Sequence, residues 1–270
     1  MAENAMSEGA KKPVIAIMRP ERYIRESVEL ARSMGFEPVT VPMVEITDMK
    51  DEYFDGFVER VLDGRADYVI FTSANGIDFT LRKIPEGSRK AFIDALNRTK
   101  VIAIGPTTRK ALEKTGINVM GMPGVYSSEG LVDYLRNDVT GRTVDTARSF
   151  YGSRQLVEGL QSCGAVVNQT KVYTLAKPEG GEQDRLIDAA LNGEISAFAF
   201  TSSMMVHNFF EHARSRASEE QVINALNSSV VAAIGGPTAQ TLAGYGVKVS
   251  AIPDKFTFEE VLRSIREQLS

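Results

Sequence analysis

The sequence contains few of the side chains that build metal centres and nucleophilic triads. Among its 270 residues there is one cysteine, Cys163, and there are two histidines, His207 and His212. A disulfide within one chain and a zinc site built from cysteines are therefore excluded, and a Ser-His-Asp triad has almost no raw material. The histidines lie five positions apart on one expected helix, which is not the i, i+4 spacing of a metal-binding pair. We therefore expect no metal and interpret both histidines as structural or solvated.

Long apolar runs and a surplus of positive charge are also missing. No stretch approaches the roughly 18 uninterrupted apolar residues of a membrane-spanning helix. The chain has 31 basic and 35 acidic residues and a net charge of −4, so it lacks the basic surface typical of nucleic-acid binding. Residues 1–12 lack the apolar core of a signal peptide and are expected to form a loose tail. We predict a cytoplasmic protein without a nucleic-acid or membrane partner.

Glycine-rich phosphate loops are absent as well. Neither GxxxxGK[ST] nor a GxGxxG motif after the first expected strand occurs in the sequence. These loops hold the phosphates of nucleotides and dinucleotides. We therefore expect no nucleotide cofactor.

The chain does contain an internal repeat of about 129 residues, a feature that decides the fold when it is present. Identical residues and triplets recur in the same order at a spacing of 129 positions, or 130 after one inserted residue. This order indicates a tandem duplication. The matches include Arg19 with Arg148, Arg25 with Arg154, 71–73 with 200–202, 103–105 with 233–235, and Thr108 with Thr238.

Each repeat shows strands alternating with helices. Continuous apolar runs predict strands that are covered on both faces, and apolar residues three or four positions apart predict the intervening helices. The alternation predicts right-handed βαβ units and hence an α/β protein of two Rossmann- or flavodoxin-like domains with parallel sheets. In the first repeat we expect strands at 14–18, 36–42, 68–71, 101–104 and 117–120, and helices at 21–34, 53–62, 76–84, 107–115 and 128–135.

One expected strand, at 143–147, carries unusually polar residues. It should match the apolar run at 14–18, yet its sequence is Thr-Val-Asp-Thr-Ala. Two explanations remain open. The strand is partly exposed, or one of its faces lines a polar site.

Four loops that follow buried strands and open helices carry the candidate binding chemistry. Hydroxyl and backbone N–H groups at a helix N-terminus can bind an anion without a charged side chain. Ordinary N-capping explains the same residues and is the better explanation for any single loop. Because the repeat pairs the four loops, we favour anion binding. The candidate residues are Ser73, Asn75, Gly105, Thr108, Ser202, Gly235 and Thr238.

Arginines at repeat-matched positions near strand ends form a second candidate group. Two interpretations fit these side chains equally well. Their guanidinium forks bind carboxylate or phosphate groups, or they are solvated helix charges. The residues are Arg19, Arg25, Arg148 and Arg154. Tyr173 precedes a linker-like segment, where a tyrosine usually packs with its hydroxyl satisfied. A phenol at this position could instead donate a proton at neutral pH.

Together these residues resemble the uroporphyrinogen-III synthase family over nearly the whole chain after the tail. Residues 71–76, Phe-Thr-Ser-Ala-Asn-Gly, match the family's most recognisable motif, and 18–20, Met-Arg-Pro, resemble its usual Thr-Arg-Pro. The order and spacing of the motifs make the resemblance specific. Further matches are 41–46, 103–105 with Thr108, 152–154, 172–173, and 233–235 with Thr238.

The resemblance implies that each domain combines parts of both repeats. Domain one would comprise 13–43 and 178–270, and domain two 44–177. Two strands would link the domains as a hinge, and the substrate would bind in the cleft between them. The family is monomeric and needs no metal or organic cofactor.

The resemblance also implies a reaction. The linear tetrapyrrole hydroxymethylbilane, which has eight carboxylates, loses water and closes to uroporphyrinogen III with inversion of ring D. The enzyme would be a cyclising hydro-lyase that could receive its unstable substrate directly from hydroxymethylbilane synthase. Tyr173 would donate the proton to the departing hydroxyl. The substrate would be bound by Thr108, Thr238, Ser73, Asn75, Ser202 and the loop N–H groups of Gly105 and Gly235, and less securely by Arg19, Arg148 and Arg154.

Two other classes of function were weighed. A non-catalytic sensor of the same fold would bind a tetrapyrrole or another polyanion without turnover. A two-domain nucleotide-sugar transferase would need a diphosphate site and an acidic ligand at a strand end, and the sequence has no convincing example of either. The synthase remains the favoured function.

Overall fold

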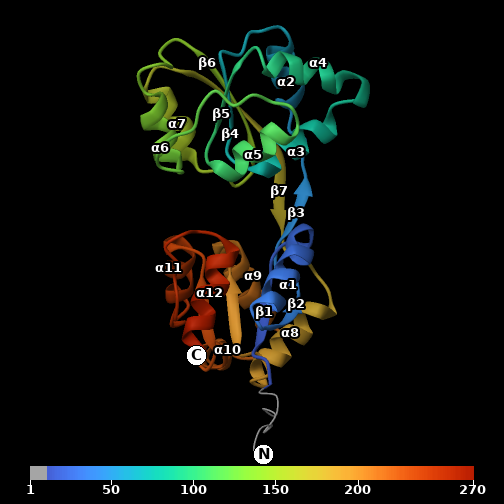
Figure 1. Cartoon of the computed structure of the whole chain (residues 1–270), viewed down its shortest axis with the longest axis vertical. Coiled ribbons are helices and arrows are strands. Elements are labelled where there is room, and N and C mark those ends of the chain that lie inside the picture. The colour runs from blue at the N-terminus through green and yellow to red at the C-terminus, as the bar shows by residue number, and fades with distance from the viewer. Residues whose placement is uncertain (1–10) are drawn as a thin grey trace, which may run out of the picture. The chain divides into compact units, whose positions relative to one another are not determined.

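The computed structural model describes residues 11–270, so all but the last two residues of the expected tail lie outside the described part of the chain. The chain forms two compact units. Unit 1 contains the residues up to Glu45 and Ala176–Ser270, and unit 2 contains Ile46–Leu175. The chain leaves unit 1 within β3 (Glu45–Asp48) and returns to it within β7 (Val166–Ala176) (Figure 1).

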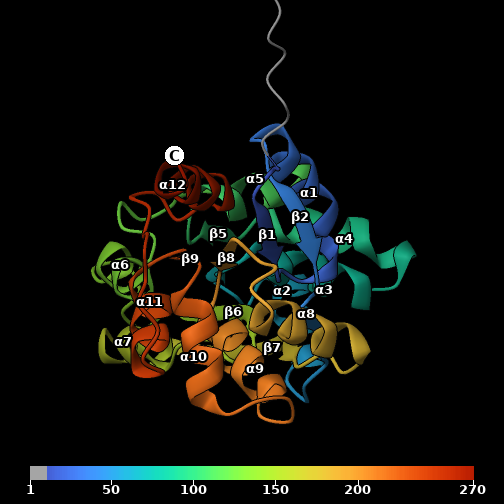
Figure 2. The ribbon, with the colours of Figure 1, turned by 90° about the horizontal axis from the view of Figure 1, so that it is seen from below.

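Unit 1 is a three-layer α/β sandwich. Its parallel sheet has the order β2-β1-β8-β9, built from β1 (Val14–Ile17), β2 (Glu37–Thr40), β8 (Ala197–Phe200) and β9 (Val230–Ala233). One face packs against α1 (Ile24–Ser33) and α12 (Phe258–Gln268). Figure 2 shows these two helices on one side of the sheet and helices of the α8–α10 segment on the other. The second helical layer contains α8 (Gly181–Leu191), α9 (Ser203–Ala213), α10 (Glu219–Asn227) and α11 (Gly236–Gly244).

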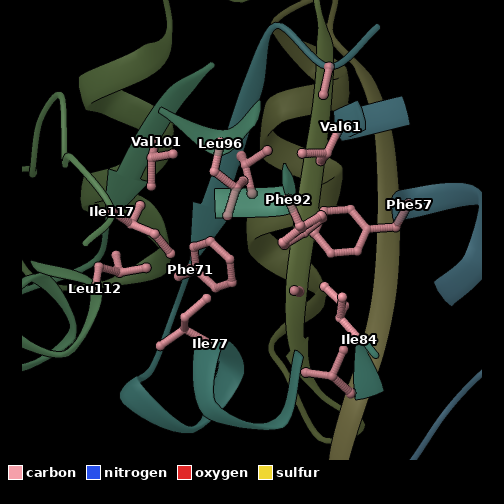
Figure 3. Close-up of a cluster of buried hydrophobic side chains, with 14 of the residues drawn as sticks. Phe57, Val61, Phe71, Ile77, Ile84, Phe92, Leu96, Val101, Leu112 and Ile117 are labelled. Carbon is pink, nitrogen blue, oxygen red and sulfur yellow. The ribbon is translucent and has the colours of Figure 1, made fainter. Parts of the chain in front are cut away.

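Unit 2 has a five-stranded sheet in the order β3-β7-β6-β4-β5. Its other strands are β4 (Tyr68–Phe71), β5 (Lys100–Ala103) and β6 (Thr143–Ser149). One face packs against α6 (Ser128–Leu135) and α7 (Arg154–Ser162). The opposite face forms a core with many aromatic side chains (Figure 3). The helices over this core are α2 (Phe54–Leu62), α3 (Ala74–Lys83), α4 (Glu86–Leu96) and α5 (Pro106–Lys114).

The two repeats exchange their first strands. β1 opens the first repeat, yet it pairs in parallel with β8 of the second repeat, with Ile15 opposite Ala197. Conversely, β6 opens the second repeat and pairs with β4 of the first, with Val144 opposite Tyr68. Each sheet is therefore completed by strands from both halves of the sequence, so neither repeat is a domain by itself.

The strand expected at 117–120 is not formed. This segment makes only an isolated bridge between Ile102 and Gly121, with Met120 N donating to Val101 O at 2.8 Å and Ala103 N donating to Gly121 O at 3.2 Å. These few bonds at the sheet edge do not extend into a ladder. The second repeat makes the same single bridge, between Ala232 and Ala251.

The polar strand at 143–147 is not partly exposed. β6 lies in the middle of its sheet, between β7 and β4, and the Asp145 side chain is fully buried. Its carboxylate accepts hydrogen bonds from Arg60 Nη2 at 2.7 Å and from Arg60 Nε at 3.0 Å. Burial nevertheless raises the pKa of Asp145, because desolvation outweighs the contribution of Arg60. The sequence polarity therefore reflects an internal ion pair.

Most helix boundaries differ from expectation by one or two residues, and two differences are larger. The helix expected at 21–34 begins with a 3-10 turn, Glu21–Tyr23, before α1, and α4 was not expected at all. None of the helices among residues 11–270 has the length and apolar character needed to cross a membrane.

Candidate active site

The predicted site residues lie at the carboxyl edges of the two sheets. Ligands of open α/β sheets bind at this edge, because the loops that follow parallel strands gather there. In unit 2, Ser73 follows β4, Gly105 follows β5 and Tyr173 lies near the end of β7. In unit 1, Ser202 follows β8 and Gly235 follows β9.

Ser73 and Tyr173 are brought together although they are 100 residues apart. The Ser73 hydroxyl and the Tyr173 phenol are hydrogen-bonded, with 3.0 Å between their oxygens. Ser73 also caps α3, because its Oγ accepts a hydrogen bond from Gly76 N at 3.1 Å. The Tyr173 ring is buried and stacks on Phe79, with 5.5 Å between ring centroids. The phenol is therefore held in one place by a stacked ring and a fixed hydroxyl.

The start of α3 fits closely against β6. A Cβ atom at Gly76 would lie 2.7 Å from the carbonyl oxygen of Ala147, which is too close for any other residue unless the backbone moves. One turn later, Thr80 Oγ1 donates to Gly76 O at 2.7 Å. The glycine of the 71–76 motif thus lets Ser73 approach the centre of the sheet.

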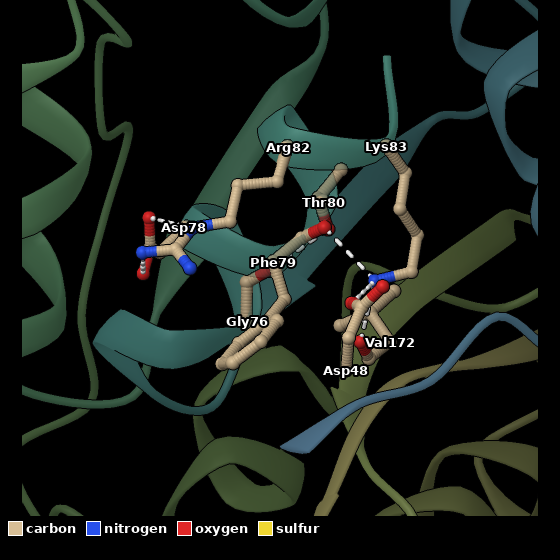
Figure 4. Close-up of polar contacts among 8 residues, drawn as sticks. All are labelled: Asp48, Gly76, Asp78, Phe79, Thr80, Arg82, Lys83 and Val172. Atoms are coloured by element: carbon tan, nitrogen blue, oxygen red, sulfur yellow. Dashed lines mark hydrogen bonds and ion pairs between the residues drawn. The ribbon is translucent and has the colours of Figure 1, made fainter. Parts of the chain in front are cut away.

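Lys83 fixes the other end of α3 to the strand that carries Tyr173 (Figure 4). Its buried Nζ donates to Val172 O at 2.7 Å and to Phe79 O at 3.1 Å, and it forms an ion pair with Asp48. This contact was not predicted, because no local pattern in the sequence links residues 83, 48 and 172. The available signal was a lysine four residues after Phe79, on the same face of the helix.

The helices α5 and α11 begin in the same way. Each has an N-cap glycine, Gly105 or Gly235, followed by proline in the first turn, and neither cap has a side-chain hydrogen bond. The first-turn N–H groups therefore lack a side-chain acceptor from the cap. Thr108 and Thr238, three residues after the caps, are buried. Both units thus present the same arrangement at their carboxyl edges.

The remaining loop residues, Ser202 and Asn75, lie at the starts of helices. Ser202 caps α9, since its Oγ accepts from Met205 N at 3.2 Å. Asn75 lies in the first turn of α3 and is half-buried. Ser73 and Ser202 are thus helix N-caps. A ligand oxygen could replace the serine hydroxyl as acceptor, or share the backbone N–H groups with it.

Arg148 is a buried cation at the carboxyl end of β6. It is 2% exposed, and its Nη2 donates to Ser153 O at 2.6 Å. Its Nε and Nη1 have no hydrogen-bond partner among the described residues. Burial lowers the pKa of Arg148, because the charged form loses its hydration.

The repeat-matched Arg19 is held differently. Its Nη1 donates to Ser27 Oγ at 2.9 Å, and its guanidinium carbon lies 4.8 Å from the centre of the Tyr23 ring and 4.7 Å from that of Phe258. Burial lowers the pKa of Arg19 as well. Arg154 is the exposed first residue of α7. Arg25 is a solvated helix charge that pairs with Glu29 at 3.2 Å.

Both histidines lie on α9. His207 Nδ1 is 2.9 Å from the Tyr245 hydroxyl, and His212 Nε2 is buried without a partner among the described residues. In the part of the chain that the structure describes, no group of three or more His, Cys, Asp or Glu side chains is placed to hold a metal ion.

A family model and several relatives of known name agree on one family. The family model described as uroporphyrinogen-III synthase HemD matches residues 25–263. A putative uroporphyrinogen-III synthase from Methanothermobacter thermautotrophicus is 30% identical over 93% of this chain and 96% of that protein. The uroporphyrinogen-III synthase of Chlorobaculum parvum is 26% identical over 94% of this chain and 98% of its own length.

Solved structures of the same family share the fold. A mutant uroporphyrinogen III synthase from the extremely thermophilic bacterium Thermus thermophilus superposes with a TM-score of 0.64 at 22% identity, over 95% of this chain and 98% of that one. The Helicobacter pylori protein gives a TM-score of 0.64 at 17% identity, over 96% of this chain and 100% of that one. The matched motifs, the exchanged repeats and these comparisons lead to one conclusion: the chain belongs to the uroporphyrinogen-III synthase family.

Proposed function

We propose that this protein is a uroporphyrinogen-III synthase that acts in tetrapyrrole biosynthesis. Its substrate would be hydroxymethylbilane, and it would close the macrocycle with inversion of ring D and loss of water, as a cyclising hydro-lyase. The match of the family model to residues 25–263 supports this function for nearly the whole chain.

The observation that carries the chemical proposal is the buried phenol of Tyr173, hydrogen-bonded to Ser73. In the first step, the Tyr173 phenol donates its proton to the hydroxyl of the substrate's hydroxymethyl group. The carbon–oxygen bond breaks, water leaves, and the pyrrole nitrogen's electrons form the azafulvene cation. The phenolate then carries the negative charge, next to the Ser73 hydroxyl that can donate to it. The substituted alpha-carbon of ring D attacks the azafulvene cation and forms a spiro intermediate. The bond from that carbon to its original methylene bridge then breaks, which leaves a second azafulvene cation on the neighbouring ring. The free alpha-carbon of ring D bonds to this cation, which inverts ring D, and the proton that this carbon loses restores the phenol.

The acidic groups of the substrate provide its binding energy. In unit 2 the starts of α3 and α5 and the Arg148 guanidinium would bind carboxylates, and in unit 1 the starts of α9 and α11 would do so, with Ser202 and Thr238. We propose the same role, binding of substrate carboxylates, for Asn75, Gly105, Thr108, Gly235, Arg19 and Arg154. Each unit would thus bind part of an elongated polyanion, and catalysis would depend largely on positioning.

We also propose that the protein works as a cytoplasmic monomer, without a metal or organic cofactor, and that it receives its substrate by transient handover from hydroxymethylbilane synthase. Such handover would limit the spontaneous closure of a reactive intermediate in water.

A coupled assay tests the function. Hydroxymethylbilane is generated in place by its synthase, this protein is added, and the products are oxidised and separated by chromatography. Predominantly type III uroporphyrin is the expected product. If only the type I product forms, at the uncatalysed rate, the protein is not a synthase. Tight binding of tetrapyrroles by the same protein would then identify a tetrapyrrole-binding sensor.

A further inference from the structure

Two exposed aromatic side chains occupy the same place in both repeats. Tyr126 and Phe256 are 130 positions apart, which is the repeat offset in this part of the chain. The exposed fractions are 57% for Tyr126 and 71% for Phe256. A single exposed ring is ordinary on a protein surface, but two at matched positions beside matched loops call for a shared explanation.

The local backbone fixes the position of each ring. Tyr126 is the middle residue of a tight turn in which Ser127 N donates to Val125 O at 2.9 Å, and Phe256 is the middle residue of a turn in which Thr257 N donates to Lys255 O at 2.8 Å. The next residue then caps a helix, because Ser127 and Thr257 cap α6 and α12 through their hydroxyls. The backbone that carries each ring is therefore fixed by a turn hydrogen bond and by the helix cap that follows it.

Each ring lies against the start of a candidate binding helix. A Cβ atom at Gly105, the N-cap of α5, would be 3.4 Å from Cγ of Tyr126, and one at Gly235, the N-cap of α11, would be 3.3 Å from Cδ1 of Phe256. The missing side chain at each cap thus leaves room for the ring. In each unit the same edge presents a helix N-terminus and an exposed ring.

The chemistry that Tyr126 and Phe256 share is the aromatic ring, since only one of them has a hydroxyl. A complementary ligand has a flat ring and an acidic group close to it, so that the acid reaches the helix N-terminus while the ring meets the side chain. A pyrrole that carries carboxylate side chains fits this description.

We propose that Tyr126 and Phe256 each contact a pyrrole ring of the substrate, while the adjacent helix N-terminus binds one of that pyrrole's carboxylates. This inference rests on the proposed function and adds specificity-determining residues to it. It explains why both turns keep an aromatic residue in water, where burial would otherwise be favourable.

Binding of uroporphyrin III, which has rings and carboxylates but does not turn over, tests the contact separately from catalysis. The variants are Tyr126→Ala and Phe256→Ala, and each should weaken binding by about threefold to tenfold, as expected for one aromatic contact. Tyr126→Phe keeps the ring and should recover most of the affinity that Tyr126→Ala loses. The matched control is Tyr53→Ala, which removes a ring that is 58% exposed at the start of α2 and should bind like the wild type.

The outcomes separate this inference from the proposed function. If the wild type forms type III product but both alanine variants bind the porphyrin like Tyr53→Ala, the ring contact is overturned and the function stands. If Tyr126→Phe fails to recover affinity, the hydroxyl and not the ring is responsible, and the inference is wrong. If the wild type neither turns over hydroxymethylbilane nor binds the porphyrin, the proposed function itself fails.

Discussion

At the scale of single residues, the proposed chemistry depends on one phenol and the groups that hold it. Tyr173 is positioned by the Phe79 ring and by Ser73, and Ser73 is positioned by the start of α3. The close approach of Gly76 to Ala147 then places α3. Each contact joins segments far apart in the sequence, so the phenol's orientation is a property of the whole unit.

Tyr173→Phe should lower kcat for type III formation by about 100-fold or more, because a positioned general acid contributes on that order. The fold should remain intact, since the ring and its stacking are kept and a single hydrogen bond contributes only about 1 kcal/mol. Ser73→Ala keeps the phenol as a proton donor but removes the hydroxyl that positions it, so it should lower kcat by a smaller factor. Equal kcat for Tyr173→Phe and wild type at saturating substrate would remove Tyr173 from the mechanism.

Arg148→Met should raise the free energy of unfolding by about 1 kcal/mol or more. The substitution removes a buried charge with two guanidinium nitrogens that have no hydrogen-bond partner among residues 11–270, and it fills a similar volume. The same variant should bind substrate more weakly if Arg148 binds a carboxylate. Urea unfolding provides the stability measurement.

The control for this prediction is Arg89→Met. Arg89 Nε donates to the carbonyl oxygens of Leu81 at 2.9 Å and Ile84 at 3.1 Å, so its removal should lower stability and leave substrate binding unchanged. A loss of stability in Arg148→Met as large as in Arg89→Met would show that the Arg148 guanidinium is fully satisfied in the folded protein.

Several contacts at this scale had no signature in the sequence. The pair Arg60–Asp145 joins residues 85 positions apart, and the sequence showed only an oddly polar strand. The position of Ser73 and Tyr173 near strand ends was predictable, because parallel strands end at one edge. Their direct hydrogen bond was not, since it depends on the strand order β7-β6-β4.

Among the helices and strands, those with a clear apolar pattern could be located from the sequence. β4 and α6 begin and end at the expected residues, because a run of four buried residues and a capped amphipathic segment are clear patterns. α4 was missed, since its three buried residues Phe92, Ala95 and Leu96 all lie in its second half. The isolated bridge at Gly121 shows that an apolar segment becomes a strand only where consecutive residues pair with a neighbour.

The packing of α9 predicts a pH dependence of stability. Burial, with a contribution from nearby Lys177, lowers the pKa of His212 in the folded protein below its ordinary value of 6.5. A hydrogen bond with the backbone of Pro178 and the charges of Asp184 and Glu211 oppose this. As pH falls through 6.5, the unfolded chain takes up a proton that the folded protein does not. Stability should therefore decrease below pH 6.5, by less than about 1 kcal/mol, because the side chain is half-buried and partly screened.

Urea unfolding at pH 7.5 and pH 5.5 measures this effect. Wild type and His212→Gln are compared, and the difference in their pH dependence isolates His212 from the carboxylates that titrate at lower pH. The same loss of stability in both proteins would show that His212 makes no contribution.

At the scale of the whole molecule, the exchange of strands between repeats determines which parts can fold alone. The middle strand of the unit 2 sheet, β6, comes from the second repeat, while β4 and β5 come from the first. A fragment that follows the repeat boundary would therefore leave both sheets incomplete. A fragment that follows the compact units would keep one sheet whole.

A fragment of residues 44–177 should unfold cooperatively in urea, whereas a fragment of residues 13–141 should not. The first contains all five strands of the unit 2 sheet, and the second lacks β6 and β7 from one sheet and β8 and β9 from the other. Circular dichroism and urea titration of both fragments check this. A cooperative transition for 13–141 and none for 44–177 would show that the repeat is the folding unit.

The fraction of type III product as a function of protein concentration is the sharpest test of synthase activity. Spontaneous closure of hydroxymethylbilane gives the type I isomer, so the two routes compete for the same substrate. If the protein is a synthase, the type III fraction should rise from zero to nearly all of the product as the protein is added. A type III fraction that stays at zero at every concentration of the folded protein would contradict synthase activity.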